Sequence, residues 1–297
     1  MSDTLSFRLP AGLSVQVQAN SLTGYDPLLL GAYVPGAAPA PLAAPPDLVL
    51  RLLEAAAPSL QIEDNTVTLA GPWQGRFPTD AYHLLYGMVR QALLARGLYS
   101  VHGACLNGVL LAGHSGVGKT TVLMRLVQQL GWPVEASNKT VVSFERGIQV
   151  VAGTTTITVR RADIEQHGLN PATMLAYGDR CAFELPALAY QTKPTAIRLM
   201  VLPQLNDGVA VCQRLSPLSA VHTLYPYFLD TVNADVLVGE GTAVFSGAPA
   251  ADVQQLLAQS LRTVCETVPV YRLSGPLDFV TQQLDKLVAG LVEEEGQ

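Results

Sequence analysis

The segment that most constrains this chain is Gly113–Thr120, whose sequence GHSGVGKT satisfies every required place of the pattern G-x-x-x-x-G-K-[ST]. A buried-strand pattern, Val109–Leu111, precedes it, and a helical pattern, Thr121–Leu130, follows it. Glycines in such a loop let backbone N–H groups curl around an anion, and the N-terminus of the next helix adds a partial positive charge. The segment therefore predicts a phosphate-binding loop that holds a nucleoside triphosphate with Mg²⁺.

The residues of this loop have distinct predicted roles. Lys119 is expected to reach the β- and γ-phosphates, and the Thr120 hydroxyl is expected to ligate magnesium. His114 occupies a place where any residue type fits, so it is interpreted as a solvent-facing spacer. The residues predicted to bind the nucleotide are Gly113, Ser115, Gly116, Val117, Gly118, Lys119, Thr120 and Thr121.

Composition and charge exclude several classes of protein. Of the 297 residues, 49% are apolar and 14% are charged, which is typical of a compact globular chain. The formal net charge of −6 argues against binding nucleic acid, which needs a basic face. No uninterrupted apolar run approaches the ~20 residues of a membrane span, so no membrane partner is expected. The N-terminus carries no secretory signal pattern.

The positions of the cysteines argue against a zinc site and for reduced thiols. Cys105, Cys181, Cys212 and Cys265 are scattered and form no cluster with histidine, so a zinc site is not expected. Cys105 and Cys212 have apolar neighbours and are predicted to be small core residues. Reduced thiols fit a cytoplasmic location.

Before residue 80 the sequence predicts a small, β-rich N-terminal region, residues 1–79. Alternating apolar residues over 5–9 and 15–19 indicate a β-hairpin. Residues 35–46 are almost only Pro, Ala and Gly, so we expect an exposed extended loop there. A short helix is predicted around Asp47–Ala56 and a strand around Thr66–Leu69.

From residue 80 the sequence predicts an α/β nucleotide domain with a mixed sheet, residues 80–292. It opens with a helix from Thr79 or Asp80 that Gly97 can end. Strands are expected over 197–202 and 209–212, paired across the turn Asn206-Asp207-Gly208. The other elements expected are strands over 141–144, 148–151, 156–160 and 270–273, and helices over 217–228, 252–265 and 278–292.

His102-Gly103 stands just before the strand that leads into the loop, and Ser115–Thr121 follows that strand. This arrangement resembles the HPr kinase/phosphorylase family, in which a His-Gly pair, a hairpin turn and a GxSGxGK[ST] loop come in this order. It is closer to the shorter HPr-kinase-like proteins, whose late strand is similar to Val268–Leu273. The resemblance covers roughly residues 80–290 and is specific over 101–121.

The resemblance implies a P-loop fold related to the nucleotide domain of phosphoenolpyruvate carboxykinase. It also implies an ATP- and magnesium-dependent kinase that transfers the γ-phosphate to a hydroxyl of a small molecule or peptide. His102 would then lie near the phosphates, as the family's histidine does. Full-length members of the family form hexamers, so a homo-oligomer is compatible with the resemblance.

One stretch departs from the family. Where the family has Ala-Asp-Asp, this chain has Ala136-Ser137-Asn138, and neither Ser137 nor Asn138 can act as a carboxylate base. Asn138 could still orient a magnesium-bound water, and Lys139 could reach a phosphate. Loss of a general base typically costs ~10²–10⁴-fold in rate. The candidate catalytic residues are therefore His102, Lys119, Asn138 and Glu135.

Three alternatives follow from this departure. Glu135 or Glu145 replaces the aspartates by a shift in register, or the acceptor needs little base assistance or brings its own base. Otherwise the chain is a non-catalytic nucleotide-binding module that supports a partner protein.

A hydrolytic GTPase or motor is disfavoured, because Asn138-Lys139-Thr140-Val141 lacks the aspartate of the guanine motif NKxD. Further candidate phosphate contacts are Arg160, Arg161, Lys193 and Arg272.

Overall fold

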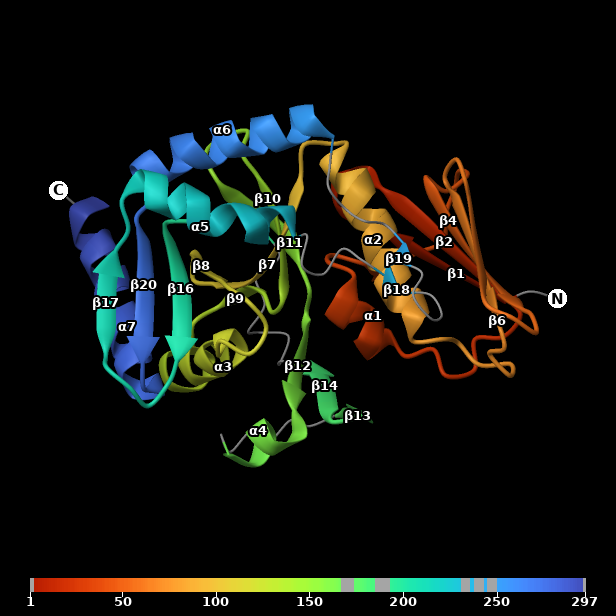
Figure 1. The fold of residues 1–297 in the computed structure, drawn as a ribbon, viewed down its shortest axis with the longest axis horizontal. Coiled ribbons are helices and arrows are strands. Elements are labelled where there is room, and N and C mark those ends of the chain that lie inside the picture. The colour runs from red at the N-terminus through yellow and green to blue at the C-terminus, as the bar shows by residue number, and fades with distance from the viewer. Residues whose placement is uncertain are drawn as a thin grey trace.

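The computed structural model describes residues 3–166, 174–184, 193–230, 236–237, 243–244 and 250–295, which form four β-sheets with helices packed on them (Figure 1). The two large sheets each contain both parallel and antiparallel strand pairs. The protein is therefore a mixed α/β structure, as the sequence predicted at this coarse level. Among the described residues, no helix is long and apolar enough to cross a membrane.

The N-terminal part forms a six-stranded sheet in the order β3-β1-β2-β4-β6-β5. Its strands are β1 Asp3–Arg8, β2 Ser14–Ala19, β3 Ala38–Pro39, β4 Leu48–Glu54, β5 Ser59–Glu63 and β6 Thr66–Gly71. A short 3₁₀ turn, Pro10–Gly12, joins β1 to β2, which confirms the predicted hairpin. Helices α1 Pro27–Tyr33 and α2 Asp80–Leu94 pack on this sheet (Figure 1).

The helix predicted over Asp47–Ala56 is wrong, because these residues form strand β4. β4 pairs in parallel with β2 on one edge and with β6 on the other, so its backbone groups are satisfied within the sheet. Its apolar side chains Leu50 and Leu52 share one face and are buried in the N-terminal core. Burial against two neighbouring strands outweighs the helical preference of this leucine-rich segment.

The N-terminal core continues past the predicted boundary at residue 80. It joins buried residues of β1, β2, β4 and β6 to Leu84, Leu85 and Val89 of α2. α1 also approaches the second half of the molecule, since a Cβ added at Gly31 would lie 2.6 Å from the Oγ1 of Thr156. The N-terminal part is therefore packed closely on the rest of the chain.

The second large sheet has the order β15-β11-β10-β7-β8-β16-β20-β17, with β9 paired to β7. Its strands are β7 Tyr99–Leu106, β8 Val109–Ala112, β9 Val134–Ala136, β10 Lys139–Ser143, β11 Gln149–Gly153, β15 Thr195–Ala196, β16 Leu199–Leu205, β17 Val211–Arg214 and β20 Val270–Gly275. β8 and β20 both run parallel to β16, and the other pairs are antiparallel.

Helices cover both faces of this sheet (Figure 1). Leu110 and Ala112 of β8 belong to the core under α5 (Pro217–Leu229) and α6 (Ala251–Thr267). The alternate residues Val109 and Leu111 belong to the core under α3 (Lys119–Leu130) and α7 (Leu277–Glu295). A strand buried on both faces needs the continuous apolar run that β8 has.

The predicted pairing of strands 197–202 and 209–212 is wrong. The turn at Asn206–Gly208 forms, with Gly208 N–H donating to Asn206 Oδ1 at 2.8 Å, but it leads the chain across to the far side of β20. β20 thus lies between β16 and β17.

Cys212, on edge strand β17, is exposed and not a core residue, whereas Cys105 is buried as predicted.

A small three-stranded sheet, β12-β14-β13, lies beside the second large sheet, with helix α4 next to it (Figure 1). Its elements are β12 Thr156–Arg160, α4 Arg161–Gln166, β13 Leu175–Tyr177 and β14 Arg180–Glu184. The fourth sheet is the two-stranded pair β18 Val236–Leu237 and β19 Ala243–Val244.

Candidate functional site

The loop between β8 and α3 has a backbone that only glycines adopt easily. Gly113, Gly116 and Gly118 have φ values of 151°, 87° and 96°. At Gly118 an added Cβ would also lie 2.4 Å from the side chain of Leu205, so both conformation and space require glycine there. The loop therefore has the turned backbone that the sequence motif predicts.

Lys119 is folded back over this loop. Its side chain is buried, and Nζ donates hydrogen bonds to the carbonyl oxygens of Gly113 at 2.6 Å and His114 at 2.8 Å. Burial, followed by the nearby Lys139, lowers the pKa of Lys119 to about 8. An ammonium group has three N–H donors, and two are used on the loop, so one is left for a ligand.

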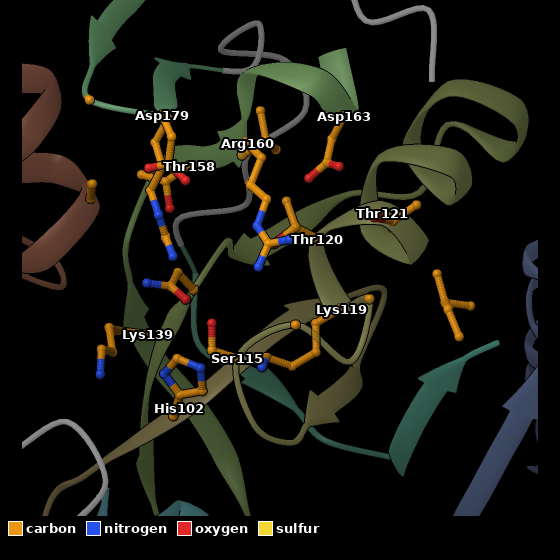
Figure 2. Close-up of a pocket in the computed structure, with 18 of the residues that line it drawn as sticks. His102, Ser115, Lys119, Thr120, Thr121, Lys139, Thr158, Arg160, Asp163 and Asp179 are labelled. Atoms are coloured by element: carbon orange, nitrogen blue, oxygen red, sulfur yellow. The ribbon is translucent and has the colours of Figure 1, made fainter. Parts of the chain in front are cut away.

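A cavity of about 880 Å³ lies against the loop. His102, Ser115, Lys119 and Thr120 lie on one side, and residues of β12, α4 and the β13–β14 turn lie opposite them (Figure 2). Its volume is near the upper end of the ~300–1,000 Å³ that small-molecule pockets occupy. The cavity can hold a ligand larger than one small metabolite.

The structure brings most of the predicted site residues together. The predicted residues that line the large cavity are His102, Ser115, Gly116, Gly118, Lys119, Thr120, Thr121, Asn138, Lys139 and Arg160. Gly113 and His114 line an adjoining space of about 30 Å³, together with His102 and Asp230. Val117 does not line the cavity, and its carbonyl accepts a hydrogen bond from Leu205 N–H at 3.0 Å. Arg161, Lys193, Arg272 and Glu145 also lie outside the lining.

Glu135 lies away from the cavity. β9 runs antiparallel to β7 with Ala136 opposite Cys105, so Glu135 lies toward the turn Asn107-Gly108, whereas the glycine loop begins at the other end of β8. Its side chain is buried near the thiol of Cys105, and burial raises the pKa of Glu135. The register shift that would bring Glu135 to the loop does not occur in this structure.

Ser137 and Asn138, the two positions where the resemblance leads us to expect aspartates, have different surroundings. Ser137 is buried, and its Oγ is 2.9 Å from Thr154 O and 2.8 Å from Thr156 O. Asn138 lines the cavity, and its carbonyl accepts a hydrogen bond from Gly103 N–H at 3.1 Å. Only position 138 is therefore placed to act on a ligand.

His102 lies on β7 directly opposite Lys139 of β10 and lines both cavities. Burial, with smaller contributions from Lys139 and Lys119, lowers the pKa of His102 to about 3. The imidazole is therefore neutral at physiological pH. It can accept a hydrogen bond, but it is a weak base and carries no charge for binding phosphate.

A buried ion pair lies beside His102. Lys139 Nζ is 2.6 Å from Asp230 Oδ2, and both side chains are almost inaccessible to solvent. The Tyr86 hydroxyl of α2 also contacts Asp230, and its ring lies 4.2 Å from Lys139 Nζ. Asp230 caps the C-terminus of α5 in a left-handed conformation with φ 48°. Three distant segments thus meet at one charged cluster.

Several residues of the site were not predicted from the sequence. α1 and α2 contribute Tyr33, His83 and Tyr86, and the rings of Tyr33 and His83 are 4.4 Å apart. The described carboxylates in the lining of the large cavity are Asp163, Asp179 and Asp207. Asp163 follows closely on Arg160-Arg161, and Asp179 stands next to Arg180. Such charge clusters in a chain with 14% charged residues are a signal that could have singled them out.

In comparisons with known proteins, no protein-family model matches the chain, and no curated protein matches it. The function assigned to the cavity therefore depends on its own residues.

Ser137→Asp is predicted to destabilise the fold. The new carboxylate would be buried against the carbonyl oxygens of Thr154 and Thr156, so the free energy of unfolding should fall by about 3 kcal/mol or more. Urea denaturation measures this change. The matched control is Asn138→Asp, which faces the cavity and should cost less than about 1 kcal/mol. Equal stability of the two variants would contradict this placement of Ser137.

Asp230→Asn should lower the free energy of unfolding by about 3–5 kcal/mol, because it leaves the Lys139 ammonium buried without its carboxylate. Asparagine tolerates the left-handed backbone, so the effect reports charge and not strain. Adding Lys139→Met to Asp230→Asn should recover much of the loss in the same denaturation experiment. If the loss in the free energy of unfolding of the double variant equals the sum of the losses of the two single variants, this interpretation is wrong.

The neutral His102 predicts a pH dependence of stability. Its pKa is about 3 in the folded protein and ~6.5 in an unfolded chain, so the unfolded state binds more protons between these values. Stability should therefore fall as the pH is lowered, by about 2 kcal/mol from this group between pH 7 and pH 5. His102→Asn should flatten that part of the pH profile. An NMR titration of the imidazole with a midpoint near 6.5 would refute it.

Proposed function

We propose that the chain is an ATP- and Mg²⁺-dependent kinase of the HPr-kinase-like type, which transfers the γ-phosphate to a hydroxyl of a small molecule or peptide. The observation that carries the proposal is the glycine loop between β8 and α3. It opens onto a large cavity with Lys119 inside it. The resemblance of residues 101–121 to that family supports the same function. We expect the protein to act in the cytoplasm, where ATP is available.

The residues of the loop fit a triphosphate. The positive φ values of Gly113, Gly116 and Gly118 turn the backbone as a phosphate cradle requires. Lys119 would donate its remaining N–H to the β- and γ-phosphates, and the N-terminus of α3 adds its partial positive charge. Neighbouring Lys139 lines the same cavity, but its charge is balanced by Asp230.

Thr120 and a nearby carboxylate would hold magnesium. Bound magnesium neutralises charge that develops on the β- and γ-phosphate oxygens. The described residues contain no cluster of three or more metal-ligating side chains, but Mg²⁺ is usually bound through one or two carboxylates, phosphates and water. Figure 2 shows Asp163 extending from α4 toward Thr120, which makes it our candidate ligand.

The cavity also offers carboxylates in place of the missing aspartates. Asp163, Asp179 and Asp207 all line it, whereas Glu135 does not. Asp207 follows β16, the parallel neighbour of β8, so it lies beside the same end of the sheet as the loop. Phosphoryl transfer depends mainly on positioning and charge, and this set of groups supports turnover without an acid at position 138.

The alternative function is a non-catalytic nucleotide-binding module that supports a partner protein. Asn138 favours it, because an amide at this cavity position cannot take a proton from an acceptor hydroxyl. The two functions share the nucleotide site and differ in turnover.

The test is transfer from γ-labelled ATP with Mg²⁺ to a panel of hydroxyl-bearing small molecules and peptides. Lys119→Met should weaken ATP binding by ~10–100-fold through loss of a charged hydrogen bond. Asp163→Asn removes the candidate magnesium ligand, so it should lower transfer and raise the Mg²⁺ concentration that transfer requires. The control is Lys193→Met, which makes the same change outside the cavity and should alter neither.

The outcomes separate the hypotheses. Tight ATP binding with no transfer to any acceptor, together with a gain of turnover in Asn138→Asp, would favour the non-catalytic module. Absence of ATP binding in the wild type would overturn both.

A further inference from the structure

The wall opposite the glycine loop carries two arginines in register. β12 and β14 are antiparallel, and Arg160 and Arg180 are direct partners across them. Both side chains are exposed, and both line the large cavity. The alternate residues Ile157, Val159 and Phe183 are buried in the core beneath α3 and α7, which fixes the sheet so that the arginine face is turned toward the cavity.

This pairing is unfavourable in the absence of an anion. Like charges directly opposite one another destabilise an antiparallel pair. Neither guanidinium forms an ion pair with another residue in the part of the chain that the structure describes. Asp163 and Asp179 share this wall without pairing with either arginine. The two cations therefore face the cavity with their donors available.

Their geometry suits an oxyanion group. A guanidinium presents a planar fork of N–H donors that matches carboxylate and phosphate oxygens. Directly opposite residues of an antiparallel pair have Cβ atoms ~4.5–5.5 Å apart, so two such forks can converge on one anion. Figure 2 shows Arg160 extending from β12 toward Thr120, at the start of α3. An anion held here lies close to the expected position of the transferred phosphate.

We propose that Arg160 and Arg180 form an anion subsite for the acceptor, so that the acceptor is a hydroxyl compound bearing a carboxylate or phosphate group. The proposal rests on the kinase function above. The loop side of the cavity serves the nucleotide, and the arginine side holds the acceptor's anionic group so that its hydroxyl faces the γ-phosphate. Lys119 and the arginine pair thus bind two different anions in one cavity.

The subsite is tested with the nucleotide site already filled. Full-length protein saturated with the non-hydrolysable analogue AMP-PNP and Mg²⁺ is titrated calorimetrically with inorganic phosphate and, separately, with L-malate. We expect saturable binding of at least one, and the preferred probe identifies the acceptor's anionic group. Arg160→Gln and Arg180→Gln should each weaken this binding by ~10-fold or more.

Arg161→Gln is the matched control, because Arg161 is the neighbouring exposed arginine and does not line the cavity. It should bind the anion as the wild type does. Thermal unfolding of each variant verifies the fold, and Arg180→Lys, which keeps the charge without the fork, should give an intermediate affinity.

Nucleotide binding is measured separately on every variant. The subsite is overturned if neither anion binds, if Arg161→Gln weakens binding as much as Arg180→Gln, or if the arginine variants lose affinity for AMP-PNP instead. Should the wild type fail to bind AMP-PNP, the kinase function fails on its own. The titration is then repeated on unliganded Lys119→Ala protein, where retained anion binding that depends on Arg160 and Arg180 still supports an anion site.

Discussion

The constraint on which the site depends is the burial of β8 on both faces. Val109 and Leu111 pack under α3 and α7, while Leu110 and Ala112 pack under α5 and α6. β7 and β16 hold its two edges by hydrogen bonds. With faces and edges both fixed, the end of β8 is held rigidly, and the glycine loop that leaves it starts from a fixed point. The turned loop and the placement of Lys119 follow from that anchoring.

The elements around the loop could be predicted because their signals are local. The glycine pattern, the apolar run of β8 and the helical pattern of α3 each lie within a few residues, and the structure has all three. β4 could not be recognised from its leucine-rich sequence, since its strand conformation comes from pairing with β2 and β6. The order of β16, β20 and β17 also depends on long-range pairing, which the turn at Asn206–Gly208 does not encode.

The same distinction holds within the site. His102 and Lys119 lie within the motif over residues 101–121, Asn138 lies 17 residues beyond it, and all three meet at the cavity as expected. Asp230 lies 91 residues from its partner Lys139, and no spacing rule links them. The alternation of buried and exposed residues along β12 determines where Arg160 points, but its pairing with Arg180 requires knowledge of the β12–β14 register. The glycine-loop side of the cavity is therefore easier to predict from the sequence than the side formed by β12 and β14.

The close approach of Gly31 to Thr156 has an evolutionary consequence. With 2.6 Å between a Cβ at position 31 and Thr156 Oγ1, a residue larger than glycine there would require α1 or the Thr156 side chain to shift. The same helix carries Tyr33 into the cavity, and α2 carries Tyr86 to Asp230. The N-terminal sheet is thus not an interchangeable module. A change in the ligand that fits this cavity would involve both halves of the gene, and recombination at the boundary between them would leave the cavity without one of its walls.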